Sequence, residues 1–358
     1  MKTYRYWIAL CGIALFGGLV QCVDRIPIDV PSEKIQNLVF DARLILGDPS
    51  IAIINVTHLL DLAQSRSLAL NVKDTYMVRD DGNELKLDRV GEGNYQLLIP
   101  KNHPFKLIPG KKYKARVEIK DGRIYESAYD VLSQDAGGSS YSTEIITKPV
   151  QVDQKFEDKP FIRVKGKVPT IINNQVINYK WEWERVARIT DSPIDGSDPK
   201  TCYIQEQLNS ADIDIISGKN IAAAEINLSL ADFPITFSYA EDAYIILHQQ
   251  IISDSSFLYW ENVSKLVTRE GRLFEEPPGR IKGNFSNSKD PQDEVFGLFY
   301  CINQQPIRLF IDHNRVGNPL TLCPPRVPPS PNPCPIATCC NCLSAPKSSL
   351  TKPIWWIN

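Results

Sequence analysis

The sequence contains few of the residues on which common catalytic sites depend. Only four of its 358 residues are histidines, and His58, His103, His248 and His313 lie far apart in the chain. This scarcity disfavours catalysis by histidine and a histidine-rich metal site. The motifs of serine hydrolases, zinc proteases, phosphate-binding loops and dinucleotide-binding folds do not occur in the sequence either. We therefore expect a protein that is not an enzyme and that needs no cofactor.

The chain also lacks an excess of charge of either sign. Lys and Arg total 40 and Asp and Glu total 42, which gives a formal net charge of −2. A nucleic-acid-binding protein usually carries a basic surface, so this balance disfavours nucleic acid as a partner. Hydrophobic residues make up 43% of the chain and charged residues 23%, which is ordinary for a folded globular protein. At about 150 residues per domain, the length suggests two or three domains.

Long apolar runs are absent, and the one short run near the start of the chain indicates export. Residues 7–20 are apolar and follow the charged residues Lys2 and Arg5. A helix needs about 20 apolar residues to cross a membrane, so this shorter run predicts a signal peptide over residues 1–21. No later segment is long and apolar enough to span a bilayer.

The apolar run ends in Leu19-Val20-Gln21-Cys22, which resembles a bacterial lipobox. In a lipobox the cysteine thiol is acylated and the chain is cleaved directly before it. Leu19 fits this motif, whereas Gln21 is larger than the residue usually found there, and an ordinary signal with an incidental Cys22 is the alternative. We expect Cys22 to carry the acyl chains that anchor the protein in a membrane. A tether over residues 22–33 would follow.

Hydrophobic patterning predicts mainly β structure for the rest of the chain. Residues 112–119 alternate between apolar and polar side chains, turn at Asp121-Gly122 and alternate again over residues 123–127. Short strands separated by such turns are typical of β-sandwiches. We expect one sandwich over residues 34–140 and a second β-rich domain over residues 141–320.

Several elements of the second region can be predicted in more detail. Residues 176–186 predict a strand with Tyr179, Trp181 and Trp183 on one face, a pattern more typical of a sandwich core than of a ligand platform. Residues 280–286 and 295–302 predict paired strands, and residues 307–312 a separate last strand. The three aspartates between residues 190 and 200 do not have the spacing of a calcium-binding loop, so we expect a solvated loop there.

One amphipathic helix is predicted, over residues 255–270. Phe257, Trp260 and Val263 recur at helical spacing, and Ser255 is the expected N-cap residue. Residues 57–65 are the one stretch of the first region that fits a helix, and the sequence leaves this open.

The region over residues 321–358 differs in composition from the rest of the chain. Seven prolines fall between Cys323 and Pro335, so this stretch cannot form a helix or a central strand and should run extended and irregular. Two adjacent tryptophans, Trp355 and Trp356, come after this proline-rich stretch. We expect them either to pack on the protein's own core or to dock a partner, and the sequence leaves both alternatives open.

The cysteines predict disulfide bonds. Nine are present, of which Cys11 lies in the predicted signal peptide and Cys22 in the lipobox. An exported protein meets an oxidising compartment, where disulfides are the default. Since seven cysteines remain, one thiol is free or pairs with another chain, and a thiophilic metal is a weaker alternative. The candidate disulfide residues are Cys202, Cys301, Cys323, Cys334, Cys339, Cys340 and Cys342.

Several short motifs of the chain resemble one known family. They are Phe257-Leu258-Tyr259-Trp260, Arg272-Leu273-Phe274-Glu275-Glu276-Pro277-Pro278, and Cys340-Asn341-Cys342 with Lys352-Pro353-Ile354-Trp355. In this order the motifs resemble the exported lipoproteins of Bacteroidota that are grouped as the domain-of-unknown-function 4249 family. The resemblance implies an outer-membrane lipoprotein with tandem immunoglobulin-like β-sandwich domains. It also implies a TonB-dependent receptor as partner, but it implies no reaction and transfers no catalytic residue.

We therefore expect a non-catalytic accessory protein that is anchored in the outer membrane by lipid at Cys22. It would assist a TonB-dependent receptor in nutrient capture or assembly. A surface adhesion or carbohydrate-binding lipoprotein is the alternative, and it depends on the exposure of Trp181, Trp183 and Trp260. A surface hydrolase is a third and weaker hypothesis, and the side of the membrane that the protein faces is left open.

Overall fold

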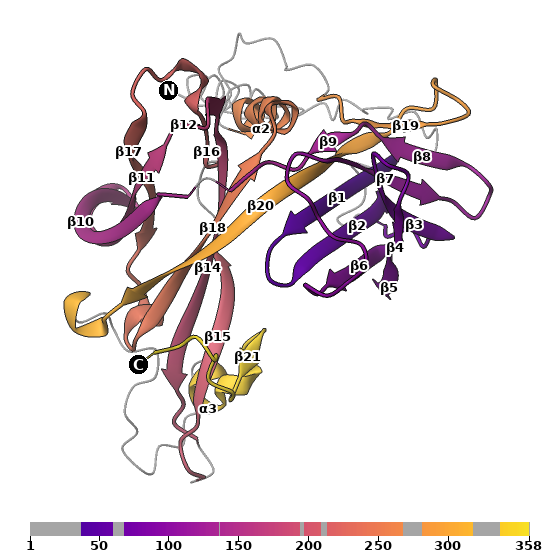
Figure 1. The fold of residues 1–358 in the computed structure, drawn as a ribbon. Helices are drawn as coiled ribbons and strands as arrows, with labels where there is room; N and C mark the ends of the chain where they lie inside the picture. The colour runs from indigo at the N-terminus through magenta and orange to yellow at the C-terminus, as the bar shows by residue number, and fades with distance from the viewer. Residues whose placement is uncertain are drawn as a thin grey trace, which may run out of the picture. The chain divides into compact units, whose positions relative to one another are not determined.

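The computed structural model describes residues 37–59, 68–135, 137–193, 197–208, 213–267, 281–317 and 337–357. The predicted signal peptide, Cys22 and the tether over residues 22–33 therefore lie outside the described residues. The chain from Asn37 to Asn358 is one compact unit. Its secondary structure is mainly β, as the patterning predicts, with one longer helix, α2 (Asp254–Val267) (Figure 1). No helix within the described ranges is long and apolar enough to cross a membrane.

The largest sheet, sheet A, has ten strands. They are β1 (Leu38–Leu46), β2 (Ser50–His58), β5 (Asp88–Gly91), β6 (Asn94–Ile99), β14 (Asn178–Thr190), β15 (Thr201–Leu208), β16 (Ile215–Ser217), β18 (Ala243–Ile252), β20 (Phe296–Ile311) and β21 (Ser348–Ser349). Their order is β21-β15-β14-β18-β20-β1-β2-β6-β5, and β16 pairs with β14. β20 pairs in parallel with β1 and antiparallel with β18. Residues far apart in sequence are therefore neighbours in this sheet.

Sheet B packs against the β1 end of sheet A. It consists of β3 (Asp74–Arg79), β4 (Glu84–Lys86), β7 (Lys112–Glu118), β8 (Ile124–Ser127), β9 (Asp130–Val131) and β19 (Phe285–Asn287). The two sheets enclose an N-terminal core that includes Phe40, Ile54, Tyr113, Tyr125 and Phe299. The predicted pairing of residues 280–286 with residues 295–302 is wrong, because β19 pairs with β8 and β20 with β1.

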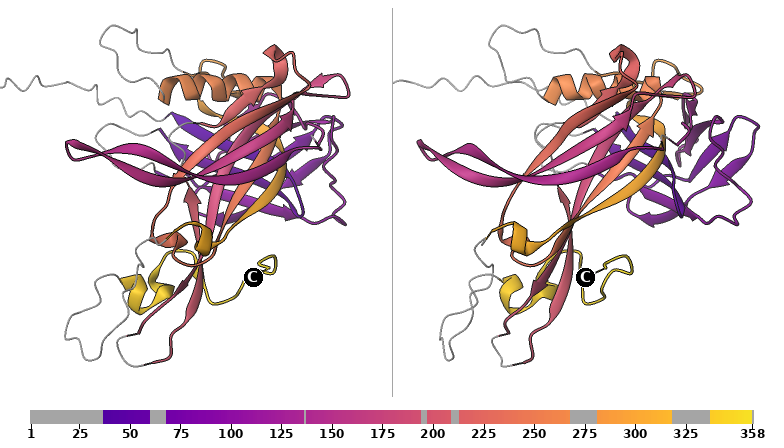
Figure 2. Two further views of the ribbon diagram at one scale, coloured as in Figure 1. Left: turned by 90° about the vertical axis from the view of Figure 1, so that its left-hand side faces the viewer. Right: turned by 60° about the vertical axis from the view of Figure 1, so that its left-hand side comes forward.

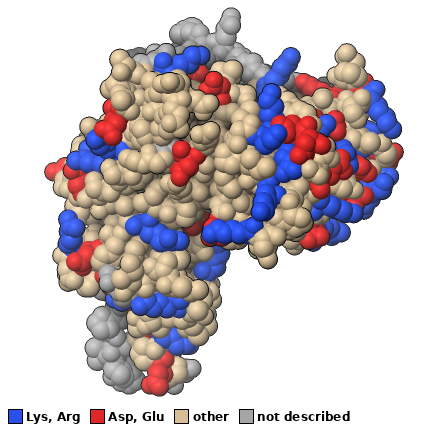
Figure 3. All heavy atoms as spheres, viewed as in Figure 1, with Lys and Arg blue, Asp and Glu red and all other residues tan. Residues whose placement is uncertain are grey.

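The outer face of sheet B is covered with charge. Its strands alternate between buried apolar residues and more exposed ionic ones, and Arg116 of β7 forms a two-pronged ion pair with Glu84 of β4, on the far side of β3. Basic and acidic side chains lie intermixed over this sandwich in Figure 3. This is the pattern of an antiparallel sheet with one face on the core and the other in water.

Sheet C covers the other end of sheet A. It consists of β10 (Ser140–Val152), β11 (Lys155–Pro169) and β17 (Glu225–Pro234), in the order β10-β11-β17. A second core lies between sheets C and A, and Tyr179, Trp181 and Trp183 of β14 belong to it, as their alternation predicts. β10 and β11 form a long two-stranded ribbon that extends away from sheet A (Figure 2). A small hairpin of β12 (Ile171–Ile172) and β13 (Gln175–Val176) follows β11.

Two local expectations need correction, and a stretch that the sequence left open is partly described. α2 begins one residue earlier than predicted, because the Ser253 hydroxyl rather than that of Ser255 accepts a hydrogen bond, from the Ser256 N–H, at the N-cap position. The two strands predicted over residues 295–302 and 307–312 form one continuous strand, β20. Thr57 and His58 end strand β2, and most of the other residues of the 57–65 stretch lie outside the described ranges.

Candidate functional site

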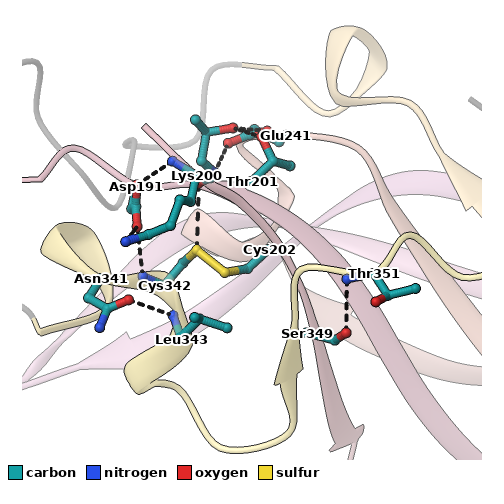
Figure 4. The surroundings of a disulfide bond; sticks show 11 residues. Asp191, Lys200, Thr201, Cys202, Glu241, Asn341, Cys342, Leu343, Ser349 and Thr351 are labelled. Carbon is teal, nitrogen blue, oxygen red and sulfur yellow. Dashed lines mark hydrogen bonds and ion pairs between the residues drawn. A yellow bond between two sulfur atoms is a disulfide. The ribbon is translucent and has the colours of Figure 1, made fainter. Parts of the chain in front are cut away.

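A disulfide bond fixes the C-terminal segment to the edge of sheet A. It joins Cys202 of β15 to Cys342 of a short helix, η4 (Cys342–Ser344), and the two Cα atoms lie 5.8 Å apart (Figure 4). Both cysteines are fully buried. A bond between positions 140 residues apart in sequence removes many conformations from the unfolded chain and so stabilises the fold.

The carboxylate of Asp191 supports this bond from the loop beside β14. One carboxylate oxygen accepts a hydrogen bond from the Lys200 N–H at 2.6 Å, and the other accepts one from the Cys342 N–H at 3.1 Å. Asp191 is only 3% exposed, so the expectation that all three aspartates of this loop are solvated is wrong for it. A buried carboxylate is tolerated where backbone N–H groups surround it. Nothing in the local sequence distinguishes Asp191 from its exposed neighbour Asp198.

The remaining cysteines differ in their environments. Cys301 of β20, one of the candidate disulfide residues, is a free thiol that is fully buried in the N-terminal core. Burial raises the pKa of this thiol well above its ordinary value, which suppresses the reactive thiolate. Cys339 and Cys340 are disulfide-bonded, whereas Cys323 and Cys334 lie outside the described residues.

The two tryptophans near residue 358 pack on the protein's own sheet. Trp356 is 3% exposed, and its ring centre lies 5.0 Å from that of Tyr203 and 4.9 Å from that of Tyr244. Trp355 packs edge-on against Tyr244, and the guanidinium of Arg308 lies 4.9 Å from the centre of its ring. β21 adds a short strand to β15 just before them. Of the two alternatives that the sequence left open, packing on the protein's own core is therefore the one that the structure shows for Trp355 and Trp356.

A buried carboxylate also links β9, β20 and the start of α2. Asp130 is 3% exposed and accepts hydrogen bonds from the Cys301 N–H and from the hydroxyls of Ser253 and Ser256. Burial raises the pKa of Asp130, and these hydrogen bonds act in the opposite direction. A negative charge at the N-terminus of a helix interacts favourably with the helix dipole. Asp130 therefore acts as a joint between the N-terminal sandwich and α2.

Charged residues lie on the face of sheet A that α2 covers. Lys180 of β14 is 4% exposed, forms an ion pair with Glu182 and lies 4.6 Å from the ring centre of Trp260 on α2. Burial lowers the pKa of the Lys180 ammonium. Arg43 of β1 approaches the same Glu182 carboxylate at 4.0 Å. The arrangement holds α2 against the sheet by a cation–π contact as well as by apolar packing.

One group of side chains has the geometry of metal ligands. Ligand atoms of Asp242, Asp312 and His313 lie within 4.8 Å of one another. However, Asp242 already pairs with His313 Nδ1 at 2.7 Å and with the guanidinium of Arg188 at 3.1 Å. The buried Asp242 carboxylate therefore already has a cationic partner in Arg188 and a hydrogen-bond partner in His313.

The tryptophans on which the carbohydrate-binding alternative depends do not form an exposed platform. Trp181 and Trp183 are 4% and 2% exposed, and their indole N–H groups donate to the Tyr141 hydroxyl at 3.2 Å and to Asp214 at 2.6 Å. Trp260 belongs to α2 and is partly buried, with its ring against that of Tyr300 of β20. Their burial removes the support that the sequence offered for stacking against a sugar.

Comparison with known proteins identifies a family but no activity. No curated protein and no solved structure matches the chain. Residues 23–308 match the family model described as "Domain of unknown function (DUF4249)". The match ends before the segment that carries Cys342 and Trp356. Because it covers well over half of the 358 residues, the chain belongs to the DUF4249 family, as its sequence motifs predict.

Proposed function

We propose that this protein is a non-catalytic accessory lipoprotein of the outer membrane, anchored through acylated Cys22 and working with a TonB-dependent receptor in nutrient capture or assembly. The observation that carries the proposal is the buried disulfide between Cys202 and Cys342. Structural disulfides persist in oxidising compartments outside the cytoplasm. Such a compartment agrees with the signal-like run and the lipobox-like sequence before Cys22.

The proposal includes the finer points of the family resemblance. These are an origin among Bacteroidota, a tandem immunoglobulin-like organisation and a receptor of the TonB-dependent class as partner. Two separate apolar cores on one long sheet support the tandem organisation. The resemblance itself supports the lineage and the receptor.

The test is affinity purification of the tagged full chain from detergent-solubilised outer membranes, read by mass spectrometry. Wild type is compared with Cys22→Ala, and Cys11→Ala serves as the matched control because Cys11 lies in the same leader but outside the lipobox-like motif. We expect wild type and Cys11→Ala to incorporate labelled fatty acid and to co-purify a TonB-dependent receptor. Cys22→Ala should incorporate none and recover less receptor.

The two parts of the proposal can fail separately. Absence of fatty acid from the wild-type protein would overturn the lipid anchor. Repeated purification of an acylated protein without any receptor would overturn the accessory role and would turn attention to independent ligand binding, with glycan arrays as the next measurement.

A further inference from the structure

The C-terminal segment exposes large apolar side chains beside its buried anchors. Ile354 and Ile357 are 104% and 84% exposed, and Leu350 is 52% exposed. Trp356, between the two isoleucines, is 3% exposed. One side of this short segment is therefore buried on sheet A, and the other presents isoleucines to the solvent. We call Leu350, Lys352, Ile354 and Ile357, together with Arg308 beside them, the tail face.

The tail face is held in place by local structure. The Trp356 N–H donates to the Pro353 carbonyl oxygen at 2.9 Å, and this hydrogen bond closes a turn with Ile354 at its outer corner. The Thr351 N–H donates to the Ser349 hydroxyl at 3.0 Å, directly after the short pairing of β21 with β15. The disulfide at Cys342 fixes the start of the segment. The isoleucines thus project from an anchored turn, and their exposure does not require that the segment come loose.

The two charged side chains of the tail face are both basic. Arg308 and Lys352 are exposed and form no ion pair with any carboxylate in the described ranges. Arg308 lies over the ring of Trp355 instead. The sequence contains no Asp or Glu after Asp312. In the view of Figure 3, the end of the molecule that carries β15 and β21 shows more basic than acidic side chains.

We propose that the tail face binds the surface of a bilayer that contains anionic phospholipid. Exposed isoleucines can enter the boundary between headgroups and acyl chains, where burial of apolar surface is favourable. Lysine and arginine beside them are attracted by negative headgroups, and their stems can lie along the apolar boundary. Tryptophan is also enriched at this depth, which suits the half-buried Trp355. The contact is a second membrane attachment, separate from any acyl chain at Cys22, and it would fix which side of sheet A faces the membrane.

The test uses the chain from Val23 to Asn358, which cannot be acylated at Cys22 and keeps all described residues. Binding is measured by co-sedimentation with vesicles of phosphatidylcholine alone and with vesicles that also contain phosphatidylglycerol. We expect binding to the anionic vesicles only, weaker at higher salt. Ile354→Ser and Ile357→Ser should each weaken this binding about tenfold, because each removes apolar area from the contact. Lys352→Gln should weaken it about fivefold.

Matched controls lie elsewhere on the surface. Phe156→Ser removes an apolar side chain that is 74% exposed at the tip of the β10–β11 ribbon, and Lys101→Gln removes an exposed lysine of the N-terminal region. Both should bind anionic vesicles as wild type does, and circular dichroism should show that every variant is folded.

Three results would overturn the proposal. They are no binding to anionic vesicles, equal binding to both vesicle types, and unchanged binding by the isoleucine variants. If Ile354→Ser instead reduces receptor recovery from membranes without changing vesicle binding, the tail face is a protein-docking surface and the lipid proposal is wrong. Because the vesicle assay uses chain without a lipid anchor or receptor, its outcome is independent of the outcome for the accessory role.

Discussion

Single buried carboxylates decide how the segments of this protein are joined. Asp191 accepts hydrogen bonds from two backbone N–H groups in different parts of the chain. Asp130 accepts one from the Cys301 N–H of β20 and another from the Ser256 hydroxyl of α2. A buried acceptor of this kind is costly to remove, because the N–H groups that it leaves behind stay away from water. Both residues therefore matter for the assembly of the fold.

The role of Asp191 gives the first prediction. Asp191→Ala should lower the free energy of unfolding by about 2–3 kcal/mol, since the N–H groups of Lys200 and Cys342 lose their acceptor. The measurement is equilibrium urea unfolding of the oxidised protein. Asp198→Ala is the control, because Asp198 lies in the same loop and is exposed. Equal effects of the two substitutions would show that Asp191 contributes only as a surface charge.

At the scale of elements, an ion cluster in sheet C links its three strands. Asp232 of β17 accepts hydrogen bonds from Arg163 of β11 at 2.8 and 2.9 Å and forms an ion pair with Lys148 of β10. The Arg163 guanidinium is the main reason that the pKa of Asp232 falls from its usual 3.8 to about 2. A carboxylate with a lowered pKa stabilises the folded state above its unfolded pKa, and this contribution is lost as the pH falls through the folded pKa.

The second prediction follows from this sign. Asp232→Asn should reduce the free energy of unfolding at neutral pH by about 1–2 kcal/mol, the range for a partly exposed, two-pronged pair. It should also remove the part of the acid destabilisation that wild type shows as the pH falls from 3.8 to about 2. Urea unfolding over a pH series measures both effects. Asp158→Asn, an exposed residue of the same sheet, should change neither, and an unchanged acid profile in Asp232→Asn would contradict the assignment.

Elements with a local signal could be predicted from the sequence, and elements that depend on distant partners could not. The alternation of Tyr179, Trp181 and Trp183 predicts β14 and its buried face, and helical spacing predicts α2. The outer half of the β10–β11 ribbon has no such signal, because both strands are exposed there and its side chains do not face a core. The pairing of β20 with β1 joins residues more than 250 positions apart, and no local pattern encodes it.

The candidate site shows the same division. The sequence identifies Cys202 and Cys342 as disulfide candidates, but it cannot choose this pair among the possible connectivities. The sequence also leaves open whether Trp355 and Trp356 pack on the protein's own core or dock a partner. It gives no sign that Ile354 and Ile357 stay exposed, because their exposure depends on which side of the turn the buried Trp356 occupies.

At the scale of the whole molecule, sheet A makes the two cores depend on each other. β20 contributes Phe299 and Cys301 to the N-terminal core and Ile311 to the second core, so one strand crosses from one core to the other. Its start is packed closely against β1: a Cβ atom on Gly297 would lie 1.8 Å from the carbonyl oxygen of Phe40. Loss of the β1–β20 contact should therefore weaken both cores together.

The last prediction tests this dependence by calorimetry of the chain from Val23 to Asn358. Wild type should unfold in one transition. Gly297→Ala should lower that single transition, with a cost of about 3 kcal/mol or more, because it combines backbone strain with a clash that β1 must move to relieve. Gly122→Ala is the matched control: Gly122 also has a positive φ, but no atom lies within 4 Å of its added Cβ, so only strain of about 1 kcal/mol is expected. Two resolved transitions, with only the one of the N-terminal sandwich shifted by Gly297→Ala, would show instead that the cores unfold independently and that β20 is a passive connection between them.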